Sequence, residues 1–92
     1  MKTADFTGTV LRATTRPEDM IPAFMQVLEK YWPEKASRLK KMYNWNESFD
    51  YESDDCDYFI EDLFDALDQV APPGHYFGSH PADYGFWPVE DM

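Results

Sequence analysis

The sequence predicts a single α+β domain of two layers, in which a three-stranded antiparallel sheet packs against helices in the order β-α-α-α-β-β. Three observations support this prediction. A short segment rich in β-branched residues opens the chain, three segments with helical periodicity follow it, and two aromatic runs around a turn-rich stretch come last. A chain of 92 residues has room for one hydrophobic core, so we expect residues 1–92 to form one domain.

Residues 6–13 are predicted to form the first strand, because β-branched and apolar residues dominate them. Gly8 within this segment indicates a bulge or a close approach of two backbones. The first helix is expected to begin between residues 17 and 22, where prolines suit a first turn and where Thr15 opens a capping-box pattern. Pro33 is expected to end that helix, because the residue before a proline avoids helical geometry.

Two more helices are expected on either side of a polar loop with interleaved aromatic residues, residues 44–53. The first of them spans residues 34–43, and its lysines and arginine make it the basic part of the molecule. Ser53 is the candidate N-cap of the second, which runs to about Val70. The buried face of this second helix is predicted from an apolar stripe at helical spacing, made of Cys56, Phe59, Ile60, Leu63, Phe64, Leu67 and Val70.

The last two strands are predicted from two aromatic runs, residues 75–77 and 84–87. The runs flank a turn-rich stretch, a pattern that is typical of a β-hairpin. A lone hairpin is only marginally stable, whereas three strands packed on a helix are stable. We therefore expect residues 6–13 to join the hairpin.

Charge is distributed unevenly along the chain. Eight Lys and Arg residues against 18 Asp and Glu residues give a formal net charge of −10. All eight basic residues lie within residues 1–41, whose net charge is +3, whereas residues 42–92 carry 13 acidic residues and neither Lys nor Arg. Such a chain is a poor candidate for binding DNA, RNA or an anionic membrane directly, so we expect a basic partner protein. Aromatic residues make up 17% of the chain, which favours a folded domain over a disordered acidic one.

Carboxylates on the last helix recur every three or four residues, which places them on one face opposite the apolar stripe. Each step advances roughly 5–6 Å along the helix axis. Phosphates on one DNA strand advance about 3.4 Å along the axis, and they lie farther apart in space because the backbone winds. We therefore expect this face and the preceding loop to imitate DNA phosphates on a basic surface. The predicted contact residues are Glu47, Asp50, Glu52, Asp54, Asp57, Glu61, Asp65 and Asp68.

A simpler interpretation treats these acids as a solvated face that keeps the protein in solution. Two features argue against it. The acidic half has no interspersed cations, and its carboxylates repel one another, which destabilises the compact state. Asp62 and the acids of residues 47–52 offer a second row beside the first.

Metal binding and catalysis are not expected. Residues 50–55 are rich in carboxylates but lack the glycine of an EF-hand loop, and His75, His80 and Asp83 are too few for a zinc site, so neither a metal nor a cofactor is predicted. Cys56 lies on the apolar stripe and is expected to behave as a small buried hydrophobe. The chain has no nucleophile-elbow or phosphate-loop motif and little room for a deep pocket, so we expect a protein that is not an enzyme.

The single cysteine excludes an internal disulfide and suits a reducing cytoplasm. No apolar run approaches the length of a membrane span, and the first residues lack the order of a signal peptide. We expect a cytoplasmic protein, with a monomer favoured over an oligomer.

Four aromatic residues lie among the acids, and two interpretations of them stay open at this point. They are either contact residues that supply large area to a partner or a small hydrophobic cluster under the loop. These residues are Trp45, Phe49, Tyr51 and Tyr58.

Residues 71–88, APPGHYFGSHPADYGFWP, resemble the C-terminal Pro-Pro-x-x-Tyr-Phe-Gly-x-His and Gly-Phe-Trp-Pro stretch of small acidic proteins carried by phages and plasmids. The acidic amphipathic helix before this segment and the helix start Ile21-Pro22-Ala23-Phe24 are similar as well, so the resemblance covers most of the chain. Such proteins often act as anti-defence factors, among them anti-CRISPR proteins and anti-restriction DNA mimics. The resemblance implies that this chain occupies the DNA-binding surface of a host defence complex.

Two functions are therefore predicted. The first is an anti-CRISPR protein of the host bacterial cytoplasm that binds a CRISPR effector complex through the acidic surface and blocks target DNA binding. The alternative is a non-inhibitory phage or plasmid adaptor that uses the aromatic C-terminal hairpin for protein–protein contact, through Tyr76, Tyr84 or Trp87. A small metal-dependent enzyme ranks last.

Overall fold

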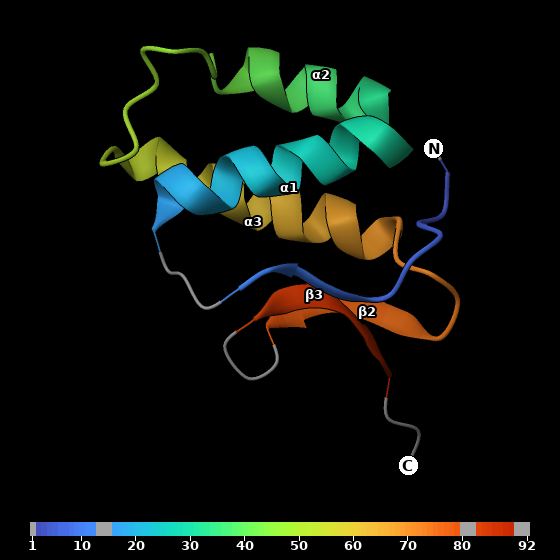
Figure 1. The fold of residues 1–92 in the computed structure, drawn as a ribbon. Coiled ribbons are helices and arrows are strands. Elements are labelled where there is room, and N and C mark those ends of the chain that lie inside the picture. Colours follow the sequence, from blue (N-terminus) through green and yellow to red (C-terminus); the bar gives the residue numbers. More distant parts are fainter. Residues whose placement is uncertain (1, 13–15, 80–82, 90–92) are drawn as a thin grey trace.

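The structure is a computed structural model that describes residues 2–12, 16–79 and 83–89. Its helices and its three-stranded antiparallel sheet follow the order β-α-α-α-β-β, which confirms the predicted α+β fold. Figure 1 shows α1 and α3 side by side over the sheet, with α2 on the side of these helices that faces away from the sheet. The elements are β1 Gly8–Leu11, α1 Pro17–Tyr31, α2 Pro33–Met42, α3 Asp54–Gln69, β2 His75–Ser79 and β3 Tyr84–Pro88.

Prolines set the boundaries of α1 and α2. Pro33 occupies the start of α2 and α1 ends at Tyr31, as predicted. Because α1 begins at its first proline, Pro22 falls in the second turn rather than the first, where it has no N–H to donate to the preceding turn. Arg16 holds the N-cap position of α1 without a capping hydrogen bond from its side chain, and Thr15, the residue expected to cap, lies outside the described residues.

Helix α3 begins directly after Ser53, at the predicted place, but the Ser53 hydroxyl does not cap it. Ser53 Oγ instead donates a hydrogen bond to the Asp50 carbonyl oxygen at 2.8 Å, so its side chain belongs to the loop. Carboxylates in the first turn of α3 interact favourably with the helix dipole and stabilise this end of the helix.

Strand β3 lies in the centre of the sheet, with β1 and β2 as antiparallel neighbours. The N-terminal strand therefore joins the hairpin as expected. The pairing of β1 shifts register between Thr9 and Leu11, so the irregularity lies beyond Gly8 rather than at it. Gly8 has a φ of +95°, and a Cβ atom added at Gly85 would lie only 2.1 Å from the Gly8 carbonyl oxygen. The close approach therefore requires glycine at position 85, whereas a Cβ at Gly8 would meet nothing within 4 Å, and the positive φ is what favours glycine there.

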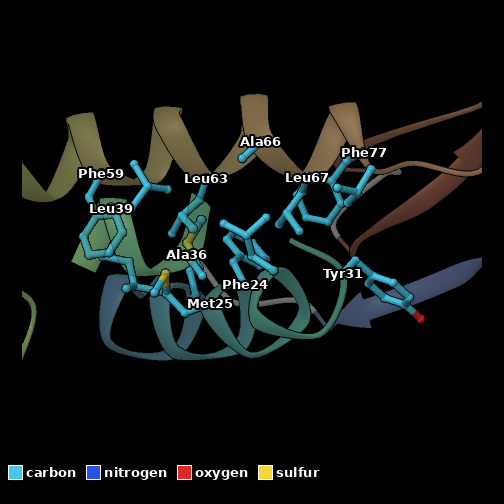
Figure 2. Packing of buried hydrophobic residues seen from close by; sticks show 14 of the residues in the cluster. Phe24, Met25, Tyr31, Ala36, Leu39, Phe59, Leu63, Ala66, Leu67 and Phe77 are labelled. Atoms are coloured by element: carbon cyan, nitrogen blue, oxygen red, sulfur yellow. The ribbon is translucent and has the colours of Figure 1, made fainter. Parts of the chain in front are cut away.

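The hydrophobic core fills the space between the sheet and the helices and continues between the helices. Figure 2 shows Leu63 and Leu67 of α3 pointing toward Phe24 of α1, and all three side chains are fully buried. Phe77 of β2 meets Phe24 edge to face, with ring centroids 5.2 Å apart, and Leu39 brings α2 into the same cluster. Because the apolar stripe of α3 faces inward, its opposite face is left to solvent.

Candidate functional site

The outer face of α3 carries the predicted acidic row. Cys56, Phe59 and Leu63 are buried on the inner side of the helix, so residues half a turn away project from the domain. Helix α3 contains neither Lys nor Arg. The eight acidic residues predicted to contact a partner, all of them exposed, are Glu47, Asp50, Glu52, Asp54, Asp57, Glu61, Asp65 and Asp68.

The structure gives three of these eight carboxylates a hydrogen bond within the domain. Asp68 Oδ1 accepts the backbone N–H of Phe77 at 3.1 Å, which joins the last turn of α3 to strand β2. Asp50 Oδ1 accepts the N–H of Glu52 at 2.9 Å and so shapes the loop. Asp65 accepts a longer hydrogen bond of 3.4 Å from the Gln69 side chain. Asp68 is therefore a structural residue as well as an exposed acid, which helical spacing alone does not indicate.

Asp62, expected as part of a second row, serves the packing of α2 against α3. Its carboxylate accepts the hydroxyl hydrogen bond of Tyr43, the residue that follows α2. Burial of the hydroxyl raises the pKa of Tyr43 to about 12, and the hydrogen bond and negative charge of Asp62, with the charges of Asp55 and Glu61, act in the same direction. Tyr43 thus stays a hydrogen-bond donor at neutral pH.

The remaining carboxylates of the row have no such role. Within the described residues, Asp54, Asp57 and Glu61 make neither a hydrogen bond through their side chains nor an ion pair. The ion pairs that the described residues do form join Arg16 to Glu18 at 2.7 Å and to Asp19 at 3.8 Å, at the start of α1. The central part of the α3 row is therefore an uncompensated line of negative charge.

The four aromatic residues among the acids divide into two kinds. Trp45 and Phe49 meet the buried ring of Phe59 edge to face, at 6.2 and 5.7 Å between centroids. Tyr51 packs on Phe49 and accepts the Trp45 indole hydrogen bond at 3.0 Å. These three residues form the hydrophobic cluster under the loop. Tyr58 alone of the four is exposed, with 61% of its surface accessible on the acidic side of α3.

A cleft lies where the loop between α2 and α3 meets the start of α3. Its volume is about 320 Å³. The predicted contact residues include Asp50 of this region but not Asp55, which lies one position off the acidic row and lines the cleft, nor Tyr43. The sequence shows only an acid and an aromatic residue on either side of a polar loop. These residues come together only when the loop is folded. The cleft is lined by Tyr43, Asn44, Asn46, Ser48, Phe49, Asp50, Ser53 and Asp55.

Cys56 is a buried thiol, and the His75 ring lies beside a backbone carbonyl group. Cys56 is 2% exposed, and burial together with nearby carboxylates raises the pKa of its thiol. His75 Nδ1 lies 3.0 Å from the Pro73 carbonyl oxygen, while His80 lies outside the described residues. The part of the chain that the structure describes contains no group of three or more metal-ligating side chains, and none of its helices is both long and apolar enough to cross a membrane.

The aromatic residues of the hairpin lie on two opposite faces of the sheet. Tyr84 packs inward on Phe24 at 5.5 Å between centroids, so it does not belong to an exposed surface. Tyr76 pairs across the strands with Trp87, and both alternate with buried phenylalanines, which places them on the face of the sheet away from the helices. Trp87 Nε1 donates to the Gly78 carbonyl oxygen at 2.9 Å.

Comparisons of the chain with protein-family models, with curated proteins and with solved structures find no match. The described residues on which the expected resemblance rests are part of α1, helix α3, the segment that follows it, and strands β2 and β3.

Proposed function

We propose that this protein is an anti-defence inhibitor that binds the basic DNA-binding surface of a CRISPR effector complex and blocks its access to target DNA. The observation that carries the proposal is the line of exposed carboxylates on α3, of which Asp54, Asp57 and Glu61 have no partner within the described residues. Ten like charges within residues 47–68 repel one another and destabilise the fold. A partner that supplies cations relieves that repulsion on binding.

The geometry of the row suits a surface built to hold DNA. A rigid helix presents its carboxylates at steps of roughly 5–6 Å along the axis, a spacing of the same order as that between phosphates of a DNA strand. Lysines and arginines that neutralise phosphates in a DNA channel can pair with such a row. Charge-assisted pairing of this kind speeds association and is weakened by salt.

The proposed mode of action is binding and not catalysis, in the cytoplasm of a host bacterium. A cleft of about 320 Å³ lies beside the loop, at the lower end of the size range of small-molecule sites. The buried thiol of Cys56 is kept protonated, and so it is a poor nucleophile. We propose a basic protein or complex as the partner, with no cofactor, no nucleic acid and no membrane.

A capture experiment tests this proposal. The tagged protein is incubated with bacterial lysate that contains an active CRISPR effector complex, and bound material is washed with rising salt or with excess duplex DNA. We expect capture of the effector complex, with release by DNA and by moderate salt. Capture that resists both treatments, or no capture of an effector complex known to be active, would contradict it.

The alternative function, an adaptor that binds through the hairpin, is favoured by one observation. Tyr76 and Trp87 lie together on a sheet face that none of the helices in the described residues covers. For this function we expect salt-tolerant binding that is lost in Tyr76→Ala and Trp87→Ala and unchanged when the α3 acids are replaced. The two functions therefore give opposite outcomes in the same capture assay.

A further inference from the structure

Three side-chain donors in the lining of the cleft beside the loop are already engaged. The Asn46 side-chain amide donates to the carbonyl oxygen of Asn44 at 3.0 Å, and Ser53 Oγ donates to the carbonyl oxygen of Asp50 at 2.8 Å. The Tyr43 hydroxyl donates to Asp62. The side chains of Asn44 and Ser48 still have donors, but the carboxylates of Asp50 and Asp55 repel an anionic ligand such as a phosphate or a carboxylate.

The lining of the cleft also offers hydrogen-bond acceptors and negative charge to a ligand. Asp50 uses Oδ1 for the Glu52 N–H, which leaves Oδ2, and Asp55 has no hydrogen bond or ion pair within the described residues. Both side chains are exposed, so both carboxylates remain hydrated in the free protein. The cleft thus presents two carboxylates that accept hydrogen bonds from a cation.

Two aromatic rings complete the walls. Tyr43 lies parallel to the buried Phe59, with centroids 4.7 Å apart and an interplanar angle of 9°, so only its opposite face and its edge are left to line the cleft. Phe49 is fixed by its own edge contact with Phe59. Aromatic faces attract cations, and a planar guanidinium stacks on them better than an ammonium group does.

We propose that this cleft binds a guanidinium group, supplied by an arginine of the basic partner, between Tyr43 and the carboxylates of Asp50 and Asp55. This assignment rests on the proposed function, and it adds one specific contact to the nonspecific attraction of the α3 row. A volume of about 320 Å³ is sufficient for one long side chain. The fork of five N–H donors on a guanidinium matches two carboxylates, which an ammonium group does not match as well.

The test is a titration of the full 92-residue chain with N-acetyl-arginine amide, followed through backbone amide chemical shifts. We expect saturable shifts centred on Asn44, Ser48, Phe49 and Asp55, with a dissociation constant on the order of millimolar. Urea, which has a similar shape but no charge, and putrescine, which has charge but no planar fork, serve as comparison ligands. Both are expected to bind at least fivefold more weakly.

A matched pair of variants keeps the test specific. Asp50→Asn with Asp55→Asn removes two charges from the cleft, and Asp54→Asn with Asp57→Asn removes two charges from the nearby row. We expect the first variant to weaken arginine binding about tenfold and the second to change it less than twofold. Equal weakening in both, shifts spread evenly over the acidic residues, or equal affinity for putrescine would overturn the assignment.

The outcome is independent of the capture assay. A chain that captures the effector complex but fails the titration keeps the proposed function and loses the arginine site. A chain that binds N-acetyl-arginine amide in the cleft but captures no effector complex keeps the guanidinium site and loses the proposed partner.

Discussion

The two sides of helix α3 differ in what their polar and apolar residues do. On the inner side, Phe59 is fully buried against three aromatic rings, and on the flanks Asp62 and Asp68 hold α2 and β2 through hydrogen bonds. On the outer side, Asp57 and Glu61 contact solvent and have no partner within the described residues. Some residues of α3 thus stabilise the domain, whereas others give its surface a negative charge.

This difference shows that an acidic helix is not uniform in function. Carboxylates that accept a hydrogen bond from the domain stabilise it, whereas carboxylates that only repel their neighbours destabilise it. Replacements on the two sides should therefore have effects of opposite sign on stability. The sign of the change in stability therefore distinguishes a surface that serves binding from residues that stabilise the fold.

The largest effect on stability is expected at Phe59. Truncation in Phe59→Ala leaves a cavity beneath Tyr43, Trp45 and Phe49, and such truncations lower the free energy of unfolding by about 3–5 kcal/mol. Urea unfolding measures this change. Tyr58→Ala, one residue earlier and 61% exposed, is the control and should change stability by less than about 0.5 kcal/mol. Similar losses in both variants would mean that the helix phase is wrong.

The next largest effect is expected at Asp68. Asp68→Ala leaves the N–H of Phe77 without its acceptor and should lower the free energy of unfolding by about 1–3 kcal/mol. Asp68→Asn keeps an acceptor oxygen and should retain most of the stability. Amide hydrogen exchange at Phe77 reports the same contact directly. If exchange there is equally slow in Asp68→Ala, the link between α3 and β2 does not exist in solution.

A smaller effect is expected from pH at Tyr43. Its pKa in the folded protein is raised to about 12 from an ordinary value of 10.0, so the folded state holds this proton more tightly than the unfolded state. The stabilisation is complete below pH 10 and is lost as pH rises toward 12. Ultraviolet difference titration should show one tyrosine that ionises near pH 12, and Tyr43→Phe should remove that step. A titration unaltered by the substitution would contradict this assignment.

The smallest effect, and one of opposite sign, is expected at Glu61. A lysine there faces Asp57 and Asp65 at i−4 and i+4, and each such pair stabilises a helix by about 0.2–0.5 kcal/mol. Glu61→Lys should therefore unfold at slightly higher urea than the wild-type protein, with Glu61→Gln between them. A clear loss of stability in Glu61→Lys would show that Glu61 has a role in the fold.

Local sequence patterns were sufficient to predict much of this molecule. The apolar stripe of α3, the break at Pro33 and the two aromatic runs of the hairpin each depend on a periodicity or a backbone restriction that acts within a few residues. The buried state of Cys56 follows from the same stripe. Exposure of the acidic row follows in turn, because it lies opposite that stripe.

Other features depended on contacts between distant segments. Helical spacing placed Asp62 and Asp68 among the acids but gave no sign of Tyr43 and Phe77, which lie 19 and 9 residues away in the chain. Whether Trp45 lies under the loop or in a partner contact depended likewise on where Phe59 lies in the fold. Side-chain partners across a fold are set by tertiary packing, which local periodicity does not encode.

The most direct measurement is the binding of target duplex DNA by the CRISPR effector complex in the presence of rising amounts of this protein. Wild type is compared with Asp57→Lys/Glu61→Lys and with the control Glu29→Lys/Glu34→Lys, which changes the net charge equally on the exposed surface of α1 and α2. We predict that wild type and the control displace the DNA and that the α3 variant, although folded, does not. Equal displacement by all three proteins would contradict the assignment of the α3 row as the binding surface.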